Sequence, residues 1–455
     1  MVCAEGRGDA SAHGPNVVSG GRTCIVRTST IGSRTRNGSA TRMSCDEGQT
    51  GPSGRLDKIG GTAPSVNWME TMRVLVVGAG IGGLAVANGL VEQGHDVQVF
   101  EHAEALRDGG AAVTVWSNGT AALRDLGVSL DGVGRELHSL RSVTESGRLL
   151  WEADLDAVTE RLGSPTVEIP RRTLIARLAE ALPAEVLHFG RRCTGVTEFE
   201  DGVVVRFDDG TVATGDLVIG ADGQRSAVRR SVLGGPPAKL TGWASWQGLT
   251  RSDLPIAHGS RTLNIAGRNG HAGLIPAGDG LLHWWFDMPW REGDPELSVA
   301  DLRAAFRGWP EPVEELLSSV TDDDLGFFPH IRHQVPRVWG GPRSTLLGDA
   351  VHAMPPAVAQ AANQTLEDAW LLSLLLPNIA GVSADPEPML RTYEQERRPR
   401  AVKVSRTAAL TSAQRSTPLQ RLGRFPKWVA TRSQVVSLRS GSNVLQALAP
   451  QVKVA

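Results

Sequence analysis

The stretch that decides the fold is Val74-Leu75-Val76-Val77-Gly78-Ala79-Gly80-Ile81-Gly82-Gly83-Leu84. Its first four residues are apolar and mostly β-branched, which predicts a short buried strand. A helical pattern from Leu84 to Gln93 follows the glycines, and a second predicted strand, Val97–Phe100, ends at Glu101. The sequence therefore predicts a strand, a glycine-rich turn, a helix and a second strand that ends on an acid.

This arrangement is typical of dinucleotide sites. The glycines allow a pyrophosphate to approach backbone N–H groups at a helix N-terminus, and an acid roughly 20 residues later binds the ribose diol. An acid fits an unphosphorylated ribose, which favours FAD or NAD over NADP at this position. A glycine-rich turn without a ligand is the alternative. The predicted binding residues are Gly78, Gly80, Ile81, Gly82, Gly83 and Glu101.

Composition sets limits on the class of protein. A chain of 455 residues, 41% of them hydrophobic, is long enough for roughly two to three domains with a large core. A net charge of −2 gives no electrostatic reason to expect nucleic acid as a partner. No apolar run reaches the roughly 18 residues of a membrane span. Only one of the four cysteines, Cys193, lies beyond residue 71, so we expect a reducing, cytoplasmic location and no disulfide framework.

Residues 1–71 are rich in Gly, Ser, Thr and Arg and have no periodic apolar pattern, so we expect a disordered extension. Positions 10–45 contain arginines but no acids, which is typical of a transit peptide. The alternative is that the natural protein begins at Met69 or Met72.

Two later segments repeat the pattern of a buried strand that ends near an acid. In Asp216–Arg230 a predicted strand is followed by Asp222 and by a helix that Ser226 can cap. In Ser344–Pro356 the acid is Asp349, and an apolar helix from Thr365 to Leu376 follows. An acid at the carboxyl end of a strand can accept hydrogen bonds from a polyol, and a helix N-terminus favours negative charge.

Residues 240–335 have a different character. Seven of the twelve tryptophans lie between Trp243 and Trp339, in segments that read as antiparallel strands. Alternation within Leu281–Met288 places His283 and Trp285 on one face and Trp284 and Phe286 on the other. One face covers a core, and the other lines an apolar pocket. The candidate pocket residues are Trp246, Gln247, Trp284 and Phe286, with simple core packing as the alternative for each aromatic ring.

No protein nucleophile or metal-ligand cluster stands out. His271 and His283 are candidate bases on the substrate side, and His352 is expected to be structural. We therefore assign no catalytic residue and no metal.

The predicted fold class is α/β, with a Rossmann-like domain, an antiparallel-sheet substrate domain and C-terminal helices. The predicted segments are the extension (1–71), the three parts of the dinucleotide domain (72–150, 169–239 and 336–400), the strands of the substrate domain (151–168 and 240–335) and a helical C-terminus (401–455).

Three stretches together resemble one family, the class A single-component flavoprotein monooxygenases of the para-hydroxybenzoate hydroxylase type. They are Gly78–Gly83 with Glu101, the Asp-Gly motif at Gly220–Arg229, and the Gly-Asp motif at Gly348–Pro356. Their order and spacing agree with the family, and the similarity covers roughly Arg73 to Arg400.

The resemblance implies a role for each motif residue. Glu101 would hold the adenosine ribose of FAD, and the backbone of Cys193 to Val196 would contact the adenine. Asp222 would support both FAD and a transient NADPH site. Arg171 would reach the flavin, Asp349 would bind the ribityl chain and Pro355 would lie beside the isoalloxazine ring. The remaining expected contacts come from Gly78, Gly80, Ile81, Gly82, Gly83, Ala112, Gly348, Ala361, Ala362 and Asn363.

The resemblance also implies an activity. NADPH or NADH would reduce FAD, and a flavin C4a-hydroperoxide would transfer one oxygen atom of O2 to an apolar aromatic or polycyclic molecule, in a monomer or a homodimer. One alternative is an oxygen-independent flavin reductase of the same fold, as in the geranylgeranyl reductases. A second is a flavin-dependent halogenase, whose Trp-x-Trp-x-Ile-Pro motif superficially resembles the sequence from His283 to Trp290, although Met288 stands at the isoleucine position. A non-enzymatic flavin-binding module is the third.

The chain departs from the family at three places. Ala359-Gln360-Ala361 stands where Gly-Gln-Gly is common, so two methyl groups approach the flavin pyrimidine edge. Ala111-Ala112-Val113 replaces Ala-Gly-Ile, and Trp246-Gln247-Gly248 replaces Trp-Arg-Gly, which removes a positive group for an acidic substrate.

Overall fold

The computed structural model describes residues 71–106, 109–376, 385–413 and 425–448. All of them belong to one unit, Val66–Ala455. The extension predicted for 1–71 lies outside the described residues except for Thr71, and the predicted C-terminal helices lie partly outside them.

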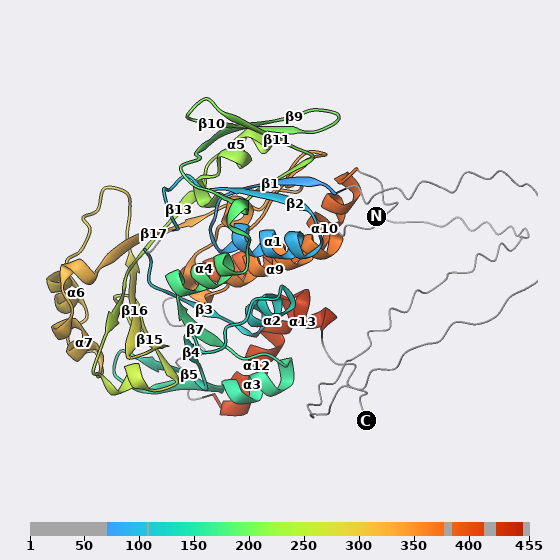
Figure 1. The fold of residues 1–455 in the computed structure, drawn as a ribbon. Coiled ribbons are helices and arrows are strands. Elements are labelled where there is room, and N and C mark those ends of the chain that lie inside the picture. The colour runs from blue at the N-terminus through green and yellow to red at the C-terminus, as the bar shows by residue number, and fades with distance from the viewer. Residues whose placement is uncertain (1–70, 107–108, 377–384, 414–424, 449–455) are drawn as a thin grey trace, which may run out of the picture. The chain divides into compact units, whose positions relative to one another are not determined.

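A five-stranded parallel sheet in the order β18-β12-β1-β2-β8 forms the first layer. Its strands are β1 (Arg73–Val77), β2 (Asp96–Phe100), β8 (Leu187–His188), β12 (Leu217–Gly220) and β18 (Ser344–Leu346). Helices α1 (Ile81–Glu92) and α9 (Ala361–Leu375) pack against one another beside β1 and β2 (Figure 1). Helices on a parallel sheet exclude water from its strands, which explains their continuous apolar runs.

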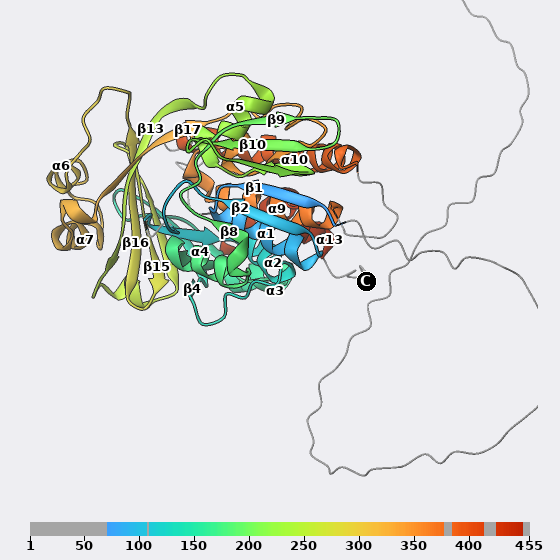
Figure 2. The same cartoon turned by 45° about the horizontal axis from the view of Figure 1, so that its top comes forward.

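A seven-stranded sheet in the order β17-β13-β16-β15-β14-β5-β6 is antiparallel except between β14 and β5. Its strands are β5 (Ser139–Thr144), β6 (Leu149–Asp154), β13 (Lys239–Arg251), β14 (Arg261–Ala266), β15 (His271–Gly278), β16 (Leu281–Pro289) and β17 (Gly326–Arg332). Helices α6 (Val299–Ala305) and α7 (Val313–Ser319) lie on its outer side (Figure 2).

Two three-stranded antiparallel sheets complete the strands. One contains β3 (Ala112–Val115), β4 (Arg135–Glu136) and β7 (Val167–Pro170), and the other contains β9 (Cys193–Glu198), β10 (Val203–Phe207) and β11 (Val212–Gly215). The remaining helices are α2 (Ser117–Asp125), α3 (Leu155–Leu162), α4 (Arg171–Glu180), α5 (Ala227–Leu233), α8 (Asp349–His352), α10 (Glu387–Ala413), α12 (Lys427–Ser440) and α13 (Val444–Ala447). Short 3-10 turns include η2 (Gly223–Arg225) and η5 (Pro356–Val358).

The predicted α/β class with an antiparallel-sheet region is confirmed, but the sheet boundaries differ from those expected. Strand β5 belongs to the seven-stranded sheet, although its residues fall within the segment 72–150 that the sequence predicts to be part of the dinucleotide domain. Within 151–168, expected to be strands, residues 155–162 form α3. The parallel partner of β5 is β14, more than a hundred residues later in the chain, so no local pattern could reveal the pairing. No helix in the described part of the chain is long and apolar enough to cross a membrane.

Candidate functional site

The three sequence motifs meet at one edge of the parallel sheet. Phe100, Val77, Gly220 and Leu346 form a continuous row across β2, β1, β12 and β18. Because these strands are parallel, the residues that follow the row all emerge on the same side, where open α/β sheets bind ligands. Glu101, the glycine turn, Asp222 and Asp349 therefore come together as the motifs predicted.

The glycine turn is shaped by close contacts on two sides and is open on a third. Gly78 has φ +106°, and a Cβ there would lie 2.6 Å from the carbonyl oxygen of Ala221. A Cβ on Gly83 would lie 1.8 Å from the Gly78 carbonyl oxygen. At Gly80, by contrast, no atom of the described residues outside its neighbours lies within 4 Å of the Cβ position. No side chain caps α1, so the N–H groups of Ile81 and Gly82 begin the helix beside this open space.

Glu101 braces the glycine turn from the neighbouring strand. The residue is 6% exposed. Its Oε2 accepts a hydrogen bond of 2.9 Å from the Ala79 N–H, and its Oε1 accepts one of 3.0 Å from the Ala103 N–H. The Nδ1 atom of His102 lies 2.8 Å from Oε1. The carboxylate thus lies at the mouth of the turn, where a ribose would bind.

Asp222 uses both of its carboxylate oxygens within the chain. Oδ1 accepts a hydrogen bond from the Ser226 hydroxyl, and Oδ2 accepts from the N–H groups of Ala227 and Val228 at the start of α5. Burial raises the pKa of this carboxyl, and these hydrogen bonds oppose the rise. Ser226 caps α5, as predicted, by accepting from the Arg229 N–H. Asp222 is therefore the residue that fixes the turn and α5 beside the glycine motif.

Asp349 differs from the other two acids because its carboxylate is exposed and makes no hydrogen bond or ion pair with the described residues. Gly348 precedes it with φ +59°, and a Cβ there would lie 2.7 Å from Thr365 Oγ1. The Gly348 N–H donates to the buried carboxylate of Asp368 at 2.9 Å. Of the three predicted acids, Asp349 is the one with both oxygens available to the hydroxyl groups of a ligand.

The start of α9 is fixed by an asparagine. The side chain of Asn363 accepts a hydrogen bond from the Trp116 N–H and donates to the carbonyl oxygens of Thr114 and Ala359. It therefore ties the helix to β3 and α2. Gln360 occupies the N-cap position without a capping side-chain bond, so the first turn of α9, which contains Ala361 and Ala362, has free N–H groups. Pro355 and η5 lead into this turn.

The other predicted cofactor residues fall on neighbouring elements. Ala112 pairs with Pro170 across β3 and β7, and the Arg171 N–H donates to the Ala111 carbonyl at the start of α4. Arg171 is exposed, as its predicted position at the helix start requires.

Cys193 and Val196 lie on β9, which packs against α5. The Val196 N–H donates to the Ser231 hydroxyl. Burial raises the pKa of the Cys193 thiol to about 11, and the charge of Asp222 adds to the effect. This thiol is therefore protonated at neutral pH and is not a nucleophile.

The seven-stranded sheet corrects the predicted pocket. Trp246, Trp284 and Phe286 are at most 1% exposed and form a core with residues of α6 and α7 on the outer face. Gln247 and Trp285 point to the opposite face, where Trp285 packs against the core of the parallel-sheet layer. The three aromatic residues therefore belong to a core and do not line a pocket, whereas Gln247 and Trp285 lie on the other face of the sheet. Within the halogenase-like segment from His283 to Trp290, Trp284 and Phe286 are therefore core residues.

The three histidines singled out in the sequence have different surroundings. His283 Nδ1 lies 2.7 Å from Glu168, whose other oxygen accepts a hydrogen bond from Thr114. His271 stacks on Trp243. His352 is fully buried and bonded to Asp368, which fits the expected structural role. Among the described residues, no group of His, Cys, Asp and Glu could hold a metal ion.

Comparison with known proteins identifies the family. The model of the FAD binding domain family matches residues 71–408. A FAD-dependent urate hydroxylase of Klebsiella oxytoca is 33% identical over 334 residues, which cover 72% of this chain and 86% of that protein. The chain belongs to the class A FAD-dependent aromatic monooxygenases.

Two further relatives of this monooxygenase support the assignment. The 3-amino-4-hydroxybenzoate 2-monooxygenase PtmB3 of Streptomyces platensis is 36% identical over 346 residues, covering 73% of this chain and 86% of that protein. The structure of Klebsiella pneumoniae HpxO complexed with FAD and uric acid matches with a TM-score of 0.70 and 28% identity over 84% of this chain and 97% of that chain. FAD is therefore the cofactor of this monooxygenase.

The sheet edge of this monooxygenase fits FAD on its own geometry. The open space at Gly80 and the uncapped start of α1 suit a pyrophosphate, and the unpaired carboxylate of Asp349 suits a polyol. Sequence reasoning missed the buried partners behind these residues, namely Glu367, Asp368 and Arg397. The signal that could have found Glu367 and Asp368 is a pair of acids inside an otherwise apolar helix, since buried carboxylates are almost always paired.

Proposed function

We propose that this monooxygenase oxidises NADPH or NADH and inserts one oxygen atom of O2 into an aromatic or polycyclic small molecule, in a reducing compartment such as the cytoplasm. The observation that carries the proposal is the row across β2, β1, β12 and β18, which places all three motifs at one sheet edge. In the overall reaction, substrate, O2, NAD(P)H and a proton give hydroxylated substrate, water and NAD(P)+.

Bound FAD would supply the redox chemistry, by accepting hydride and activating O2. The chain's own residues would bind and orient it. The first turn of α1 at Ile81 and Gly82 would hold the pyrophosphate, Glu101 the adenosine ribose and Asp349 the ribityl hydroxyls. The free N–H groups at the start of α9, near Ala361 and Ala362, would stabilise negative charge on the reduced ring.

The face of the seven-stranded sheet that carries Gln247 and Trp285 would form the wall of the substrate pocket. This face combines an indole ring with polar side chains from neighbouring strands, among them His271. A flat aromatic ring with hydrogen-bonding substituents suits such a wall better than a purely apolar ligand. The wall would also exclude water from the reacting centre.

The first experiment measures NADPH and NADH oxidation together with O2 uptake and peroxide release, across a panel of phenols, indoles, quinolones and polycyclic polyketides. A true substrate raises the rate of NADPH or NADH oxidation and lowers the fraction of the consumed O2 that is released as hydrogen peroxide. Flavin reduction without any O2 uptake would instead indicate the oxygen-independent reductase and overturn the proposal.

The second experiment tests the assignment of Asp349. Asp349→Ala should largely abolish flavin retention, because its carboxylate is available to the ligand, whereas the exposed Asp253→Ala should retain flavin. Asp222→Asn should keep flavin but slow its reduction by NADPH. Wild-type flavin content and reduction kinetics in both site variants would show that the two roles are wrongly assigned.

A further inference from the structure

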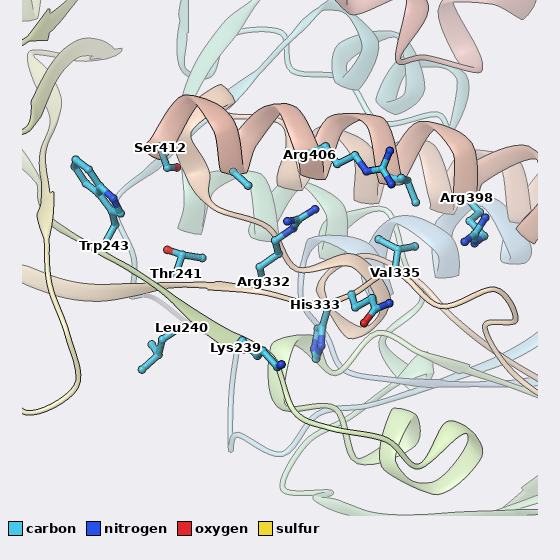
Figure 3. Close-up of a pocket in the computed structure, with 13 residues that line it drawn as sticks. Lys239, Leu240, Thr241, Trp243, Arg332, His333, Val335, Arg398, Arg406 and Ser412 are labelled. Carbon is cyan, nitrogen blue, oxygen red and sulfur yellow. The ribbon is translucent and has the colours of Figure 1, made fainter. Parts of the chain in front are cut away.

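A cavity of about 560 Å³ lies between the paired ends of β13 and β17 and helix α10, and it is lined by cations (Figure 3). Lys239, Arg332, Arg398 and Arg406 all line it, and no Asp or Glu does. None of these four forms an ion pair with another described residue. A cleft lined by one sign of charge concentrates the field and attracts ions of opposite charge.

Helix α10 contributes a stripe of side chains from residues 398–412 to this cavity. Arg398, Val402, Arg406, Ala409 and Ser412 line it, at spacings of four, four, three and three residues. Residues three and four apart lie on the same side of a helix, so the two arginines project from a single stripe. In Figure 3, Arg332 reaches from the strand below toward this helix and Arg406.

The strands contribute two cations at directly opposed positions. Lys239 on β13 is the register partner of Arg332 on β17. Like charges directly opposite one another in a sheet repel, and an anion bound between the strands and the helix would relieve this repulsion. The register then shifts after Leu240, and the buried hydroxyl of Thr241, which lines the cavity, has no hydrogen-bond partner.

His333 connects the cavity to the predicted FAD site. It lines the cavity, its N–H donates to the Ala353 carbonyl between Asp349 and Pro355, and its ring bonds to the Gln224 carbonyl in the Asp-Gly motif. A ligand held in the cavity would therefore lie against the elements that carry both acids. That position suits a reductant whose redox-active ring must reach the flavin while its charged part stays bound in the cavity.

We propose that this cavity binds the diphosphate of the nicotinamide dinucleotide, with Lys239, Arg332, Arg398 and Arg406 as the binding cations. Arginine presents a planar fork of donors that matches phosphate oxygens, and four cations exceed the charge of a diphosphate. This inference rests on the proposed use of NADPH or NADH. It goes beyond that proposal by naming the residues that hold the donor, none of which belongs to the three motifs.

The test uses the FAD-loaded enzyme with Lys239→Glu and Arg406→Glu combined, because both side chains are exposed and neither makes a hydrogen bond within the described part of the chain. Titration calorimetry with inorganic pyrophosphate should show at least a tenfold weaker Kd. Anaerobic flavin reduction should show at least a tenfold higher Kd for NADPH, with a limiting rate within twofold of wild type. Arg432→Glu, an exposed arginine on α12, is the matched control for a charge reversal and should leave both values unchanged.

The possible outcomes separate the two proposals. If neither NADPH nor NADH reduces the wild-type flavin, the proposed function fails. If the wild type is reduced and the double variant keeps the wild-type Kd for NADPH, only the cavity assignment fails. Pyrophosphate that competes with the organic substrate, and not with NADPH, would assign the anion to a phosphorylated substrate and overturn the donor assignment.

Discussion

Ala359 shows how a single residue can carry strain beside the predicted flavin site. It has φ 48° and ψ 36°, a left-handed conformation that costs an L-residue with a side chain roughly 1–2 kcal/mol. Its carbonyl accepts a hydrogen bond from the side chain of Asn363. The asparagine that fixes the start of α9 therefore also holds this strained turn. The alanine at this position, where the resemblance implies glycine, is therefore conformationally unfavourable and not only bulky.

Replacing the two alanines that flank Gln360 should have opposite effects on stability. Ala359→Gly should increase the free energy of unfolding by up to about 1 kcal/mol, because glycine adopts the left-handed conformation without strain. Ala361→Gly, in the first turn of α9, should lower it by roughly 0.5–1 kcal/mol. Urea denaturation of the FAD-loaded enzyme measures both. Effects of the same sign would mean that backbone strain does not govern this turn.

Asp287 on β16 and His330 on β17 lie on the two strands that flank β13, and both are within 2.6 Å of the Ser245 hydroxyl on that middle strand. Their pKa values are shifted in opposite directions. Burial raises the pKa of the Asp287 carboxyl to about 7 from its usual 3.8, and it lowers the pKa of the His330 imidazole to about 4. The stability that Asp287 contributes in its protonated form is lost as the pH rises through about 7. The stability that His330 contributes in its neutral form is lost as the pH falls from its usual 6.5 through about 4.

Asp287→Asn removes the first of these two effects. The free energy of unfolding of the variant, relative to that of the wild type, should therefore be higher at pH 8 than at pH 5, because only the wild type must bury a carboxylate above pH 7. Denaturation curves at several pH values between 5 and 8 measure the difference. The exposed Asp253→Asn is the control, and parallel curves for Asp287→Asn and wild type would contradict the assignment.

At the scale of elements, α9 and α10 are joined by a fully buried ionic cluster. Arg397 on α10 donates to Asp368 Oδ1 at 2.7 Å, to Glu367 Oε2 at 3.0 Å and to the side chain of Gln364 at 2.8 Å. Asp368 in turn bonds to His352 and to the N–H of Gly348. Through Asp368, the cluster therefore fixes the backbone of Gly348, the residue that precedes Asp349.

Breaking this cluster should be strongly destabilising. Arg397→Met leaves two carboxylates buried without their cation, which should lower the free energy of unfolding by about 3–5 kcal/mol. Arg177→Met removes a half-exposed surface pair with Glu180 and should cost less than about 1 kcal/mol. Urea denaturation compares the two variants. A loss in Arg397→Met no larger than that in Arg177→Met would show that the cluster contributes little.

At the scale of the whole molecule, the predicted FAD site is assembled from segments that are far apart in the sequence. Residues 73–101, 217–228 and 344–363 supply its three motifs, and they are adjacent only through the strand order of the parallel sheet. A ligand that bridges all three should stabilise the folded state as a unit.

FAD should therefore raise the Tm of the apoprotein more than FMN does, because FMN lacks the adenosine that Glu101 is expected to bind. At a ligand concentration of about 100 Kd, the stabilisation should be about 2.7 kcal/mol. Thermal denaturation over a series of FAD and FMN concentrations measures the effect. Equal shifts with the two ligands would show that the glycine turn and Glu101 do not take part in binding.

Much of the site could be predicted from the sequence because its signals are local. The first motif lies within about thirty residues, and it consists of a buried strand, the glycines that follow it and the acid at the end of the next strand. Short-range geometry therefore determines how these residues are placed relative to one another. The acids Asp222 and Asp349 could be predicted for the same reason, since each lies just beyond an apolar strand.

Only the tertiary structure decided the contacts between distant segments. Alternation along β16 predicts two faces, but it does not say which face meets α6 and α7, so the prediction that Trp284 and Phe286 line the pocket is wrong. Similarly, Lys239 and Arg406 read as ordinary surface cations, and only the placement of α10 beside the ends of β13 and β17 brings them to one cavity. Periodicity specifies which residues share a face, whereas the partner of that face depends on how the whole chain packs.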